Sequence, residues 1–216
     1  YSVAKISGMK MCEAYRKQYG YDYISIIPTN LYGPGDNFDP LNSHVIPGLI
    51  HRFHLEKLSH QPSVSIWGSG SPLREFMYVD DASHAILSLM EKYSSSEPIN
   101  IGTGQEISIK SLCLRIAKVV DYNGSLNFDP SKPDGAERKL LDSTKFLSNC
   151  GASFISLDDG LLNTYEWYKE NVTFIEKGTY KVSISHAMRN NGEVTGVKNL
   201  DGIIDVGFSV EEKTFK

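Results

Sequence analysis

The chain has 216 residues, of which 40% are hydrophobic, 22% charged and 11% aromatic, and its formal net charge is −4. This composition excludes collagen-like, low-complexity and wholly disordered proteins, and the acidic balance offers no basic footprint for nucleic acid. No apolar run approaches the ~20 residues that a membrane-spanning helix needs. We therefore expect neither nucleic acid nor membrane as a partner.

The cysteines and the first residue bear on the origin of the chain. Cys12, Cys113 and Cys150 are widely spaced and contain no Cys-x-x-Cys pair. Such an odd, sparse set favours a reducing compartment over a disulfide scaffold, so we expect a cytoplasmic protein. The chain opens on Tyr1, without Met and without a signal-peptide pattern. We expect it to be the C-terminal part of a longer protein.

The first predicted elements come in the order that is typical of α/β proteins: a helix, a buried strand and a loop at the end of the strand. Residues 1–19 are predicted to form a helix, because apolar residues recur at roughly helical spacing and Gly20 can end it. The β-branched run 23–27 is typical of a buried strand in a parallel sheet and ends at Pro28. The Gly- and Pro-rich segment 29–35 is predicted as a loop. Ligands of α/β sheets bind at such strand ends.

The alternation continues along the chain. A helix is expected over 42–58, starting near Ser43 and broken early by Pro47. Further strands are expected at 63–67, 74–79, 99–101 and 126–128, and helices up to Lys92, from Ser108 to Val120 and from Ser156 to about Glu170. Asp80 or Asp81, Ser108 and Ser156 are the expected N-caps of these helices. Beyond Asn171, alternation at 180–185 and recurrent Gly, Asn and Asp predict a β-rich or loose tail.

Tyr1 and Lys5 form a Tyr-x-x-x-Lys pair, whose side chains share one face of a helix. An ammonium beside a phenol favours the phenolate, which makes the tyrosine a usable proton donor or acceptor. Tyr165 and Lys169 form a second copy, for which we expect only packing and solvent contact. Only the first copy is followed by a helix, a buried strand and Pro28-Thr-Asn-Leu-Tyr-Gly-Pro34.

This combination resembles the extended short-chain dehydrogenase/reductase family, whose members modify nucleotide sugars with a bound nicotinamide cofactor. The resemblance extends from Tyr1 to about Glu170 and is narrowed by seven ordered motifs. These are Asn30-Leu-Tyr-Gly-Pro34, Asp36-Asn-Phe38, Asn42-Ser-His-Val-Ile-Pro47, Arg52-Phe-His54, Trp67-Gly-Ser-Gly70, Arg74-Glu-Phe76 and Ser131-Lys-Pro-Asp-Gly135. They resemble the members that combine 3,5-epimerisation and 4-reduction of GDP-4-keto-6-deoxy-D-mannose.

The resemblance implies NADP(H) as the cofactor and Tyr1, Lys5 and His44 as catalytic residues. His44 would work as an acid/base group with a cysteine upstream of the tyrosine, which suits epimerisation alpha to a ketone. The implied cofactor-binding residues are Tyr1, Lys5, Pro28, Thr29, Asn30, Leu31 and His44. Four histidines fall between His44 and His60, but Glu56 is the single carboxylate there, so no metal site is expected.

Arg52, Trp67, Arg74, Lys132 and Asp134 are the candidate substrate-binding residues. Guanidinium groups match phosphate oxygens in a bidentate way, and cations must meet the charge of a diphosphate. Trp67 offers a flat face for a base or sugar, and Asp134 can accept hydrogen bonds from a base or sugar edge. In the family, the residues that match these positions contact the nucleotide sugar.

The expected fold is the C-terminal part of an NAD(P)-binding Rossmann-type extended short-chain dehydrogenase/reductase with a smaller α/β substrate-binding domain. Residues 1–40 would be the last helix and strand of the Rossmann domain, and 41–170 the substrate-binding region interleaved with late Rossmann elements. Residues 171–216 would be an appended tail: a fused domain, a lineage-specific extension or a mis-joined reading frame. The family's Gly-rich phosphate turn and its upstream Ser and Cys are absent from the chain, so we expect it to turn over little alone.

Two other functions stay open. The chain could belong to another nucleotide-sugar enzyme, such as a 4-epimerase or a 4,6-dehydratase, or it could be a non-catalytic nucleotide-sugar binding module. Family members commonly pair through helices that include the Tyr–Lys helix, so a homodimer is expected for the complete enzyme.

Overall fold

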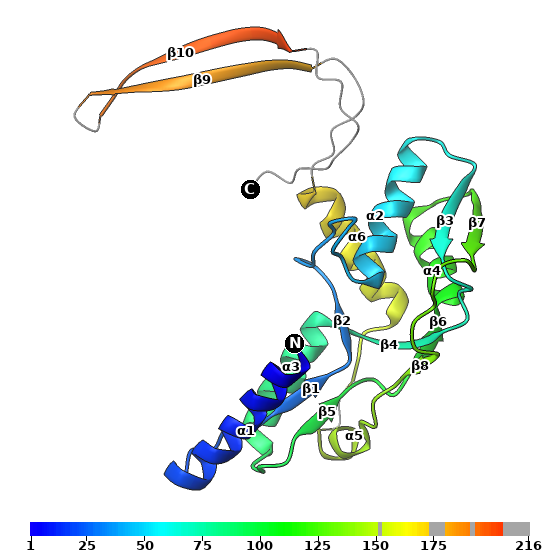
Figure 1. Ribbon diagram of the computed structural model, residues 1–216, viewed down its shortest axis with the longest axis vertical. Coiled ribbons are helices and arrows are strands. Elements are labelled where there is room, and N and C mark those ends of the chain that lie inside the picture. The colour runs from blue at the N-terminus through cyan, green and yellow to red at the C-terminus, as the bar shows by residue number, and fades with distance from the viewer. Residues whose placement is uncertain (151–152, 173–179, 191–192, 205–216) are drawn as a thin grey trace. The chain divides into compact units, whose positions relative to one another are not determined.

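A computed structural model describes residues 1–150, 153–172, 180–190 and 193–204 (Figure 1). The chain divides into two compact units, Tyr1–Lys169 and Glu170–Lys216. In the second unit, β9 (Tyr180–Asn190) pairs antiparallel with β10 (Glu193–Ile204). The β-rich tail predicted from the alternation of residues 180–185 is therefore present in the described residues. None of the helices within the described ranges has the length and apolar character to cross a membrane.

The first unit alternates helices and strands along its length (Figure 1). Its elements are α1 (Ser2–Tyr19), β1 (Ile26–Pro28), β2 (Asn30–Tyr32), α2 (Val45–Leu58), β3 (Ser63–Trp67), β4 (Leu73–Tyr78), α3 (Val79–Lys92), β5 (Ile99–Ile101), β6 (Glu106–Ser108), α4 (Ile109–Val120), β7 (Ser125–Asp129), β8 (Arg138–Lys139), α5 (Thr144–Cys150) and α6 (Leu157–Asn171).

The strands of this unit pair mostly in parallel, with partners far apart in sequence. Strand β1 pairs with β5, β2 with β4, and β3 with β7, all in parallel. Strand β4 also pairs in parallel with β8 and antiparallel with β6. Parallel neighbours need crossover connections, which the helices supply. The mixed α/β fold expected from the sequence is thus confirmed.

Several helix ends follow the predicted capping chemistry. Gly20 ends α1 in the left-handed region, with φ 72°, and its N–H donates to the carbonyl of Arg16. Ser108 Oγ accepts from the N–H of Ser111 at 3.1 Å at the start of α4. Ser156 Oγ accepts from the N–H of Asp159 at 3.1 Å at the start of α6. These caps were visible in sequence because each one involves residues within four positions of one another.

Two predictions about helix starts are wrong. Pro47 does not break α2 but lies within its first turn, where a missing N–H leaves no intrahelical bond unmade. Neither Asp80 nor Asp81 caps α3, because Tyr78 holds the cap position and both carboxylates fall in the first turn. Asp81 instead accepts a hydrogen bond from the N–H of Ile155 at 3.0 Å, a long-range contact that no local pattern reveals.

The strands near the predicted 29–35 loop also differ from the expectation. Strand β1 starts at Ile26, later than the run 23–27, and Tyr23 is 48% exposed. The segment expected as a loop contains β2, whose three residues pair with Phe76, Met77 and Tyr78 of β4. The short strands β6 and β8 and the helix α5 were not expected either. Elements of two or three residues exist because a partner strand lies beside them, so local sequence does not predict them.

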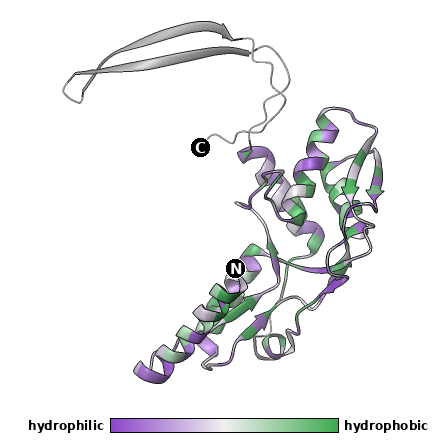
Figure 2. Cartoon of the chain, viewed as in Figure 1, coloured by the Kyte–Doolittle hydropathy of each residue, from purple (hydrophilic) through white to green (hydrophobic). Residues whose placement is uncertain are grey.

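The principal core lies between α3, β4, β5 and α5. Its members are Met77, Ala82, Ala85, Leu89, Ile99, Ile101 and Phe146. A second packed region joins α2 to α4 and β3, where Ile50, Phe53 and Ile116 are fully buried. Helix α1 contributes no buried residue, although Figure 2 shows hydrophobic residues along it. Cys12 of α1 is half-buried.

Candidate active site

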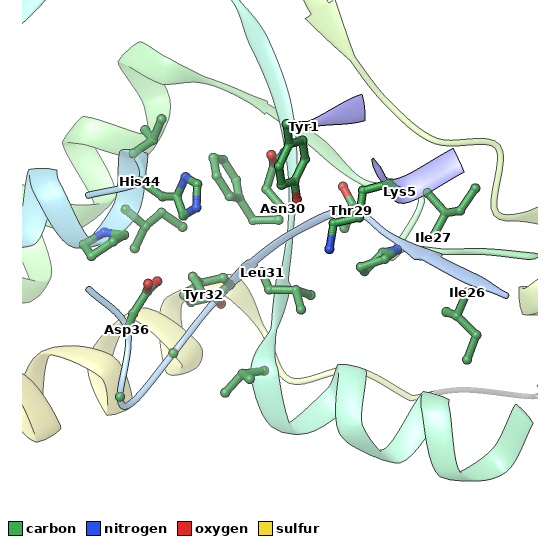
Figure 3. Close-up of a pocket in the computed structure, with 18 of the residues that line it drawn as sticks. Tyr1, Lys5, Ile26, Ile27, Thr29, Asn30, Leu31, Tyr32, Asp36 and His44 are labelled. Carbon is green, nitrogen blue, oxygen red and sulfur yellow. The ribbon is translucent and has the colours of Figure 1, made fainter. Parts of the chain in front are cut away.

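One cavity of about 890 Å³ collects residues from several separate segments of the first unit. It is lined by the start of α1, by β1 and β2 with the residue between them, and by the start of α2 (Figure 3). Every residue expected to be catalytic or to bind the cofactor lines this cavity: Tyr1, Lys5, Pro28, Thr29, Asn30, Leu31 and His44. The fold therefore brings together a set that the sequence distributes over 44 positions.

Tyr1 and Lys5 lie one helical turn apart at the start of α1. The Lys5 Nζ atom lies 5.3 Å from the centroid of the Tyr1 ring, so both side chains occupy one face of the helix as their spacing predicts. Both side chains are exposed. The phenol and the ammonium are therefore neighbours in the lining of the cavity.

Strand β4 holds the segment around Thr29 in place. The main-chain carbonyl of Glu75 accepts from Thr29 Oγ1 at 3.3 Å and from Asn30 Nδ2 at 2.7 Å. The N–H of Thr29 donates to the carbonyl of Ile101 at 3.0 Å. The two polar side chains of this segment are thus bonded to the sheet, and they fix the course of the backbone along the cavity.

His44 reaches the cavity from the N-terminus of α2. It is the N-cap residue, with extended backbone angles, and its carbonyl accepts from the N–H of Gly48 at 3.0 Å. Its imidazole is exposed. In Figure 3, the labelled side chains of Tyr1, Lys5 and His44 lie on one side of the β2 segment. Three groups that can donate protons therefore face a common space.

The walls of the cavity between these groups are largely apolar. Ile27, Leu31, Ile46, Phe76 and Val79 line it. Where β2 ends, Gly33 has a φ of 155°, and a Cβ placed there would lie 2.5 Å from a methyl carbon of Val79. Apolar walls with an ammonium, a phenol and an imidazole beside them suit a flat aromatic ring that is attached to a ribose.

The candidate substrate residues form a second cluster outside the lining of that cavity. The Arg52 Cζ and Lys132 Nζ atoms lie 5.8 and 5.9 Å from the Trp67 ring centroid. Trp67 is 67% exposed. Arg52 also donates to the carbonyl of Ser65 at 2.8 Å. Two cations therefore flank one exposed indole, an arrangement that suits an aromatic ligand carrying negative charge.

Arg74 and Asp134 adjoin this cluster. Strand β8 follows Asp134 along the chain and pairs with β4 beside Arg74. A Cβ on Gly135 would lie 3.7 Å from Arg74 Nη2. Both carboxylate oxygens of Asp134 are bonded to Ser69, one to its N–H and the other to its hydroxyl, each at 2.7 Å. The sequence suggested that Asp134 accepts from a ligand and did not indicate this internal partner.

Glu75 has a structural role that the Arg74-Glu-Phe76 motif did not predict. Its side chain is completely buried in β4, and its carboxylate accepts from the N–H of Gly104 at 2.7 Å and of Leu141 at 3.3 Å. A Cβ on Gly102 would lie 2.5 Å from Glu75 Oε1. Glu75 therefore joins strand β4, which carries Arg74, to two other segments. The available signal was a charged residue in the middle of an apolar strand.

The histidines of α2 other than His44 have structural partners. His51 Nδ1 lies 2.7 Å from the Tyr168 hydroxyl, and His54 Nδ1 lies 2.9 Å from the Tyr165 hydroxyl. Burial lowers the pKa of His51 to about 4 and also lowers the pKa of His54. Within the described ranges, no group of three or more metal-ligating side chains occurs. These histidines link α2 to α6 as neutral rings.

The second Tyr-x-x-x-Lys copy belongs to the same packing layer. Tyr165 is buried, and burial raises the pKa of its phenol. Lys169 forms an ion pair with Glu166 at 2.8 Å. The same four-residue spacing thus serves packing in α6, while in α1 it faces a cavity.

The chain is similar in sequence to a known family and to known proteins. Residues 1–102 match the model of the NAD dependent epimerase/dehydratase family. Over 177 residues the chain is 52% identical to Probable GDP-L-fucose synthase 1 of Oryza sativa subsp. japonica, covering 82% of this chain and 54% of that protein. Over 180 residues it is 50% identical to GDP-L-fucose synthase of Escherichia coli (strain K12), covering 79% of this chain and 56% of that protein.

Solved structures show the same relationship. A GDP-L-fucose synthetase from Naegleria fowleri bound to NADP matches with a TM-score of 0.75 and 32% identity, covering 79% of this chain and 56% of that one. UDP-glucose 4-epimerase from Thermotoga maritima with UDP-glucose matches with a TM-score of 0.68 and 28% identity, covering 79% of this chain and 53% of that one. The chain spans about half the length of the relatives it matches.

The C-terminal region resembles a different family. Residues 156–210 match the model of the GldH lipoprotein family. This match covers α6 and most of the tail, and it falls beyond the segment matched by the epimerase model. The two ends of the chain are therefore similar to unrelated groups of proteins.

Proposed function

Since this chain is a homologue of the GDP-L-fucose synthases, within the extended short-chain dehydrogenase/reductase family, we propose that it forms the C-terminal part of an NADPH-dependent enzyme. The enzyme epimerises C3 and C5 of GDP-4-keto-6-deoxy-D-mannose and reduces C4, which gives GDP-L-fucose. The observation that carries the proposal is the convergence of Tyr1, Lys5 and His44 on one cavity. Homology alone predicts these residue types, and their shared place in the lining of one cavity supports the proposal that they act on one substrate.

The residues of the cavity divide the acid/base work. His44 and the cysteine expected upstream of Tyr1 act on opposite faces of the carbon next to the ketone: one removes its proton to form the enolate, and the other protonates the enolate from the opposite face, which inverts the centre. Tyr1 then donates its proton to the oxygen at C4, and the Lys5 ammonium, 5.3 Å from the ring, stabilises the phenolate that results. General acid/base groups of this kind contribute roughly 10²–10⁴-fold to rate.

The cavity fits the nicotinamide and ribose end of NADP(H). Lys5 and Tyr1 can hold the ribose hydroxyl groups, and Ile27, Leu31 and Ile46 offer apolar contact for the ring. The bound cofactor supplies hydride to C4. The phosphate-binding turn of the family is not in this sequence, so these residues account for one end of the cofactor.

The second cluster is the proposed site for the GDP moiety. Trp67 is exposed and flanked by Arg52 and Lys132, so it can stack on the base while the cations face the diphosphate. Arg74 adds a guanidinium group from β4. We also propose that the complete enzyme is a cytoplasmic homodimer, as its relationship to the family implies.

The decisive test uses this chain completed at its N-terminus with the upstream region of the Escherichia coli relative. With GDP-4-keto-6-deoxy-D-mannose in deuterated water, His44→Gln should abolish deuterium incorporation at C3 and C5 while NADPH binding is retained. Tyr1→Phe should lower the rate of NADPH oxidation by roughly 10²-fold or more. His60→Gln, in an exposed turn after α2, is the matched control and should behave as wild type. Unchanged deuterium incorporation in His44→Gln would remove His44 from the proposed role.

The same assay separates the alternative functions. The structural similarity to UDP-glucose 4-epimerase supports one alternative, a 4-epimerase or 4,6-dehydratase. Such an enzyme would prefer other substrates, so faster turnover with UDP-linked than with GDP-linked sugars would favour that class. GDP-sugar binding without any NADPH oxidation in the completed chain would indicate a non-catalytic binding module.

A further inference from the structure

We infer that Ser69 is a positioning residue of the nucleotide-sugar site, and that it forms with Asp134 a clamp that fixes the orientation of Trp67. The inference rests on the proposed function, because it concerns the GDP end of that site. It assigns Asp134 a role different from direct contact with the ligand. It also adds Ser69, which was not among the candidate site residues.

The first observation is the geometry of the turn after β3. Residues 68–71 form a Gly-Ser-Gly-Ser turn in which Gly68 and Gly70 have φ angles of 85° and 78°. A Cβ on Gly70 would lie 2.5 Å from the Phe128 ring, and a Cβ on Gly68 would overlap Asp134 Oδ1. The turn therefore requires both glycines, and its backbone is packed tightly between β7 and the segment that carries Asp134.

The second observation is that one carboxylate holds this turn through two bonds. Asp134 Oδ1 accepts from the Ser69 N–H and Oδ2 accepts from the Ser69 hydroxyl, both at 2.7 Å. The Ser69 hydroxyl is also 2.7 Å from that of Ser71. Hydrogen bonds to a carboxylate are shorter and stronger than neutral ones, and here they link residues 65 positions apart. The carboxylate is thus committed to the protein.

The third observation is that the clamp lies between Trp67 and Lys132 in the sequence of the two segments that it joins. Trp67 precedes the turn by one residue, and Lys132 precedes Asp134 by two. Fixing Ser69 to Asp134 therefore sets the position of the indole relative to the Lys132 ammonium, which lies 5.9 Å from the ring centroid. Within the described ranges, none of Arg52, Arg74 and Lys132 is recorded in an ion pair with a carboxylate. The cations remain available for a diphosphate, and the clamp keeps the stacking surface beside them.

The physical reason for such a device is the exposure of Trp67. An exposed indole at the end of β3, next to a glycine-containing turn, can adopt several rotamers, and binding a ligand must order them at a cost in free energy. A turn held by two charge-assisted bonds is ordered beforehand. Loss of the clamp should therefore weaken nucleotide binding without removing any group that contacts the nucleotide.

The test uses the full 216-residue chain with Trp167→Phe, so that Trp67 is the sole tryptophan. In this background, Ser69→Ala, Asp134→Ala and the double variant are compared for GDP affinity by calorimetry and for the anisotropy and acrylamide quenching of Trp67 fluorescence. Ser71→Ala is the matched control because its hydroxyl contacts Ser69 and not Asp134. Ser69→Thr keeps the hydroxyl and should restore the wild-type signal.

The clamp predicts that Asp134→Ala raises the dissociation constant for GDP by roughly five- to tenfold and lowers the anisotropy of Trp67. It predicts a smaller change in the same direction for Ser69→Ala, and a double variant no weaker than Asp134→Ala alone. If Asp134→Ala raises the dissociation constant for GDP by the same factor in the Ser69→Ala chain as in the parent chain, Asp134 acts independently of Ser69. That result would indicate direct contact with the ligand and would overturn the inference. If the chain binds no GDP, the proposed function fails, and the Trp67 fluorescence still decides the clamp, since unchanged anisotropy and quenching in both single variants would refute it.

Discussion

Glu75 shows how a single buried charge organises the region between the two clusters. Its carboxylate is fully buried and accepts backbone N–H groups from Gly104 and Leu141, while its main-chain carbonyl accepts from Thr29 and Asn30. A buried carboxylate is tolerated only when such donors surround it. One residue of β4 thus joins the wall of the cavity to the strand that carries Arg74.

Glu75→Ala is expected to lower the free energy of unfolding by about 3 kcal/mol, since two partly buried hydrogen bonds from backbone N–H groups to the carboxylate are lost at about 1–3 kcal/mol each. Urea unfolding of the 216-residue chain, followed by circular dichroism, measures the change. Glu97→Ala is the control, because Glu97 is exposed and its carboxylate is 3.9 Å from Lys145 Nζ, and it should leave stability unchanged within error. Equal losses in the two variants would contradict the anchoring role of Glu75.

At the scale of an element, α6 begins at a local serine cap and packs against α2 through its tyrosines. Ser156 satisfies the N–H of Asp159 at its start, and Tyr165 and Tyr168 bond the two histidines of α2 along its length. The rings of Tyr168 and Phe38 also lie 4.8 Å apart. The cap defines where the helix begins, and that start places both tyrosines opposite α2.

Ser156→Ala should cost about 1 kcal/mol of stability, which is typical for an N-cap serine. Ser156→Asn should recover most of the loss, because its side-chain oxygen can accept the same N–H. Thermal unfolding of the three chains provides the comparison. A Ser156→Asn chain as unstable as Ser156→Ala would mean that the hydroxyl acts through its 2.6 Å bond to the Asp159 carboxylate rather than as a cap.

For the molecule as a whole, the two His–Tyr pairs between α2 and α6, His51 with Tyr168 and His54 with Tyr165, make the stability of the fold depend on pH. Burial lowers the pKa of His51 from 6.5 to about 4, so the unfolded chain binds a proton that the folded chain excludes between these values. Stability therefore rises with pH through this window and is lost as the pH falls from 6.5 towards 4. His54 shifts in the same direction for the same reason.

The free energy of unfolding should accordingly drop by on the order of 3 kcal/mol between pH 6.5 and 4 through His51 alone. His51→Gln removes this titration, so its stability should vary less with pH than that of the wild type. His60→Gln lies in an exposed turn and should keep the full dependence. Urea titrations at half-unit intervals of pH provide the test, and parallel curves for wild type and His51→Gln would rule out the linkage.

The sequence by itself determined the features that depend on neighbours or on motif order. The caps at Gly20, Ser108 and Ser156 were predicted and are present, because each needs only residues a few positions away. The spacing of Tyr1 and Lys5 placed them on one helix face. The order of seven motifs predicted the α/β fold and the family, which the homologues support.

Only the tertiary structure decided which segments meet. Strand β2 forms in a Gly- and Pro-rich segment because β4 lies beside it, Glu75 is buried because three segments close around it, and Asp134 is held by a serine far away in sequence. Pairing energy between distant segments leaves no mark on the local pattern of either one. The sequence could therefore name the chemical groups of the site, but their convergence on one cavity, and the commitment of Asp134 to Ser69, followed only from folding.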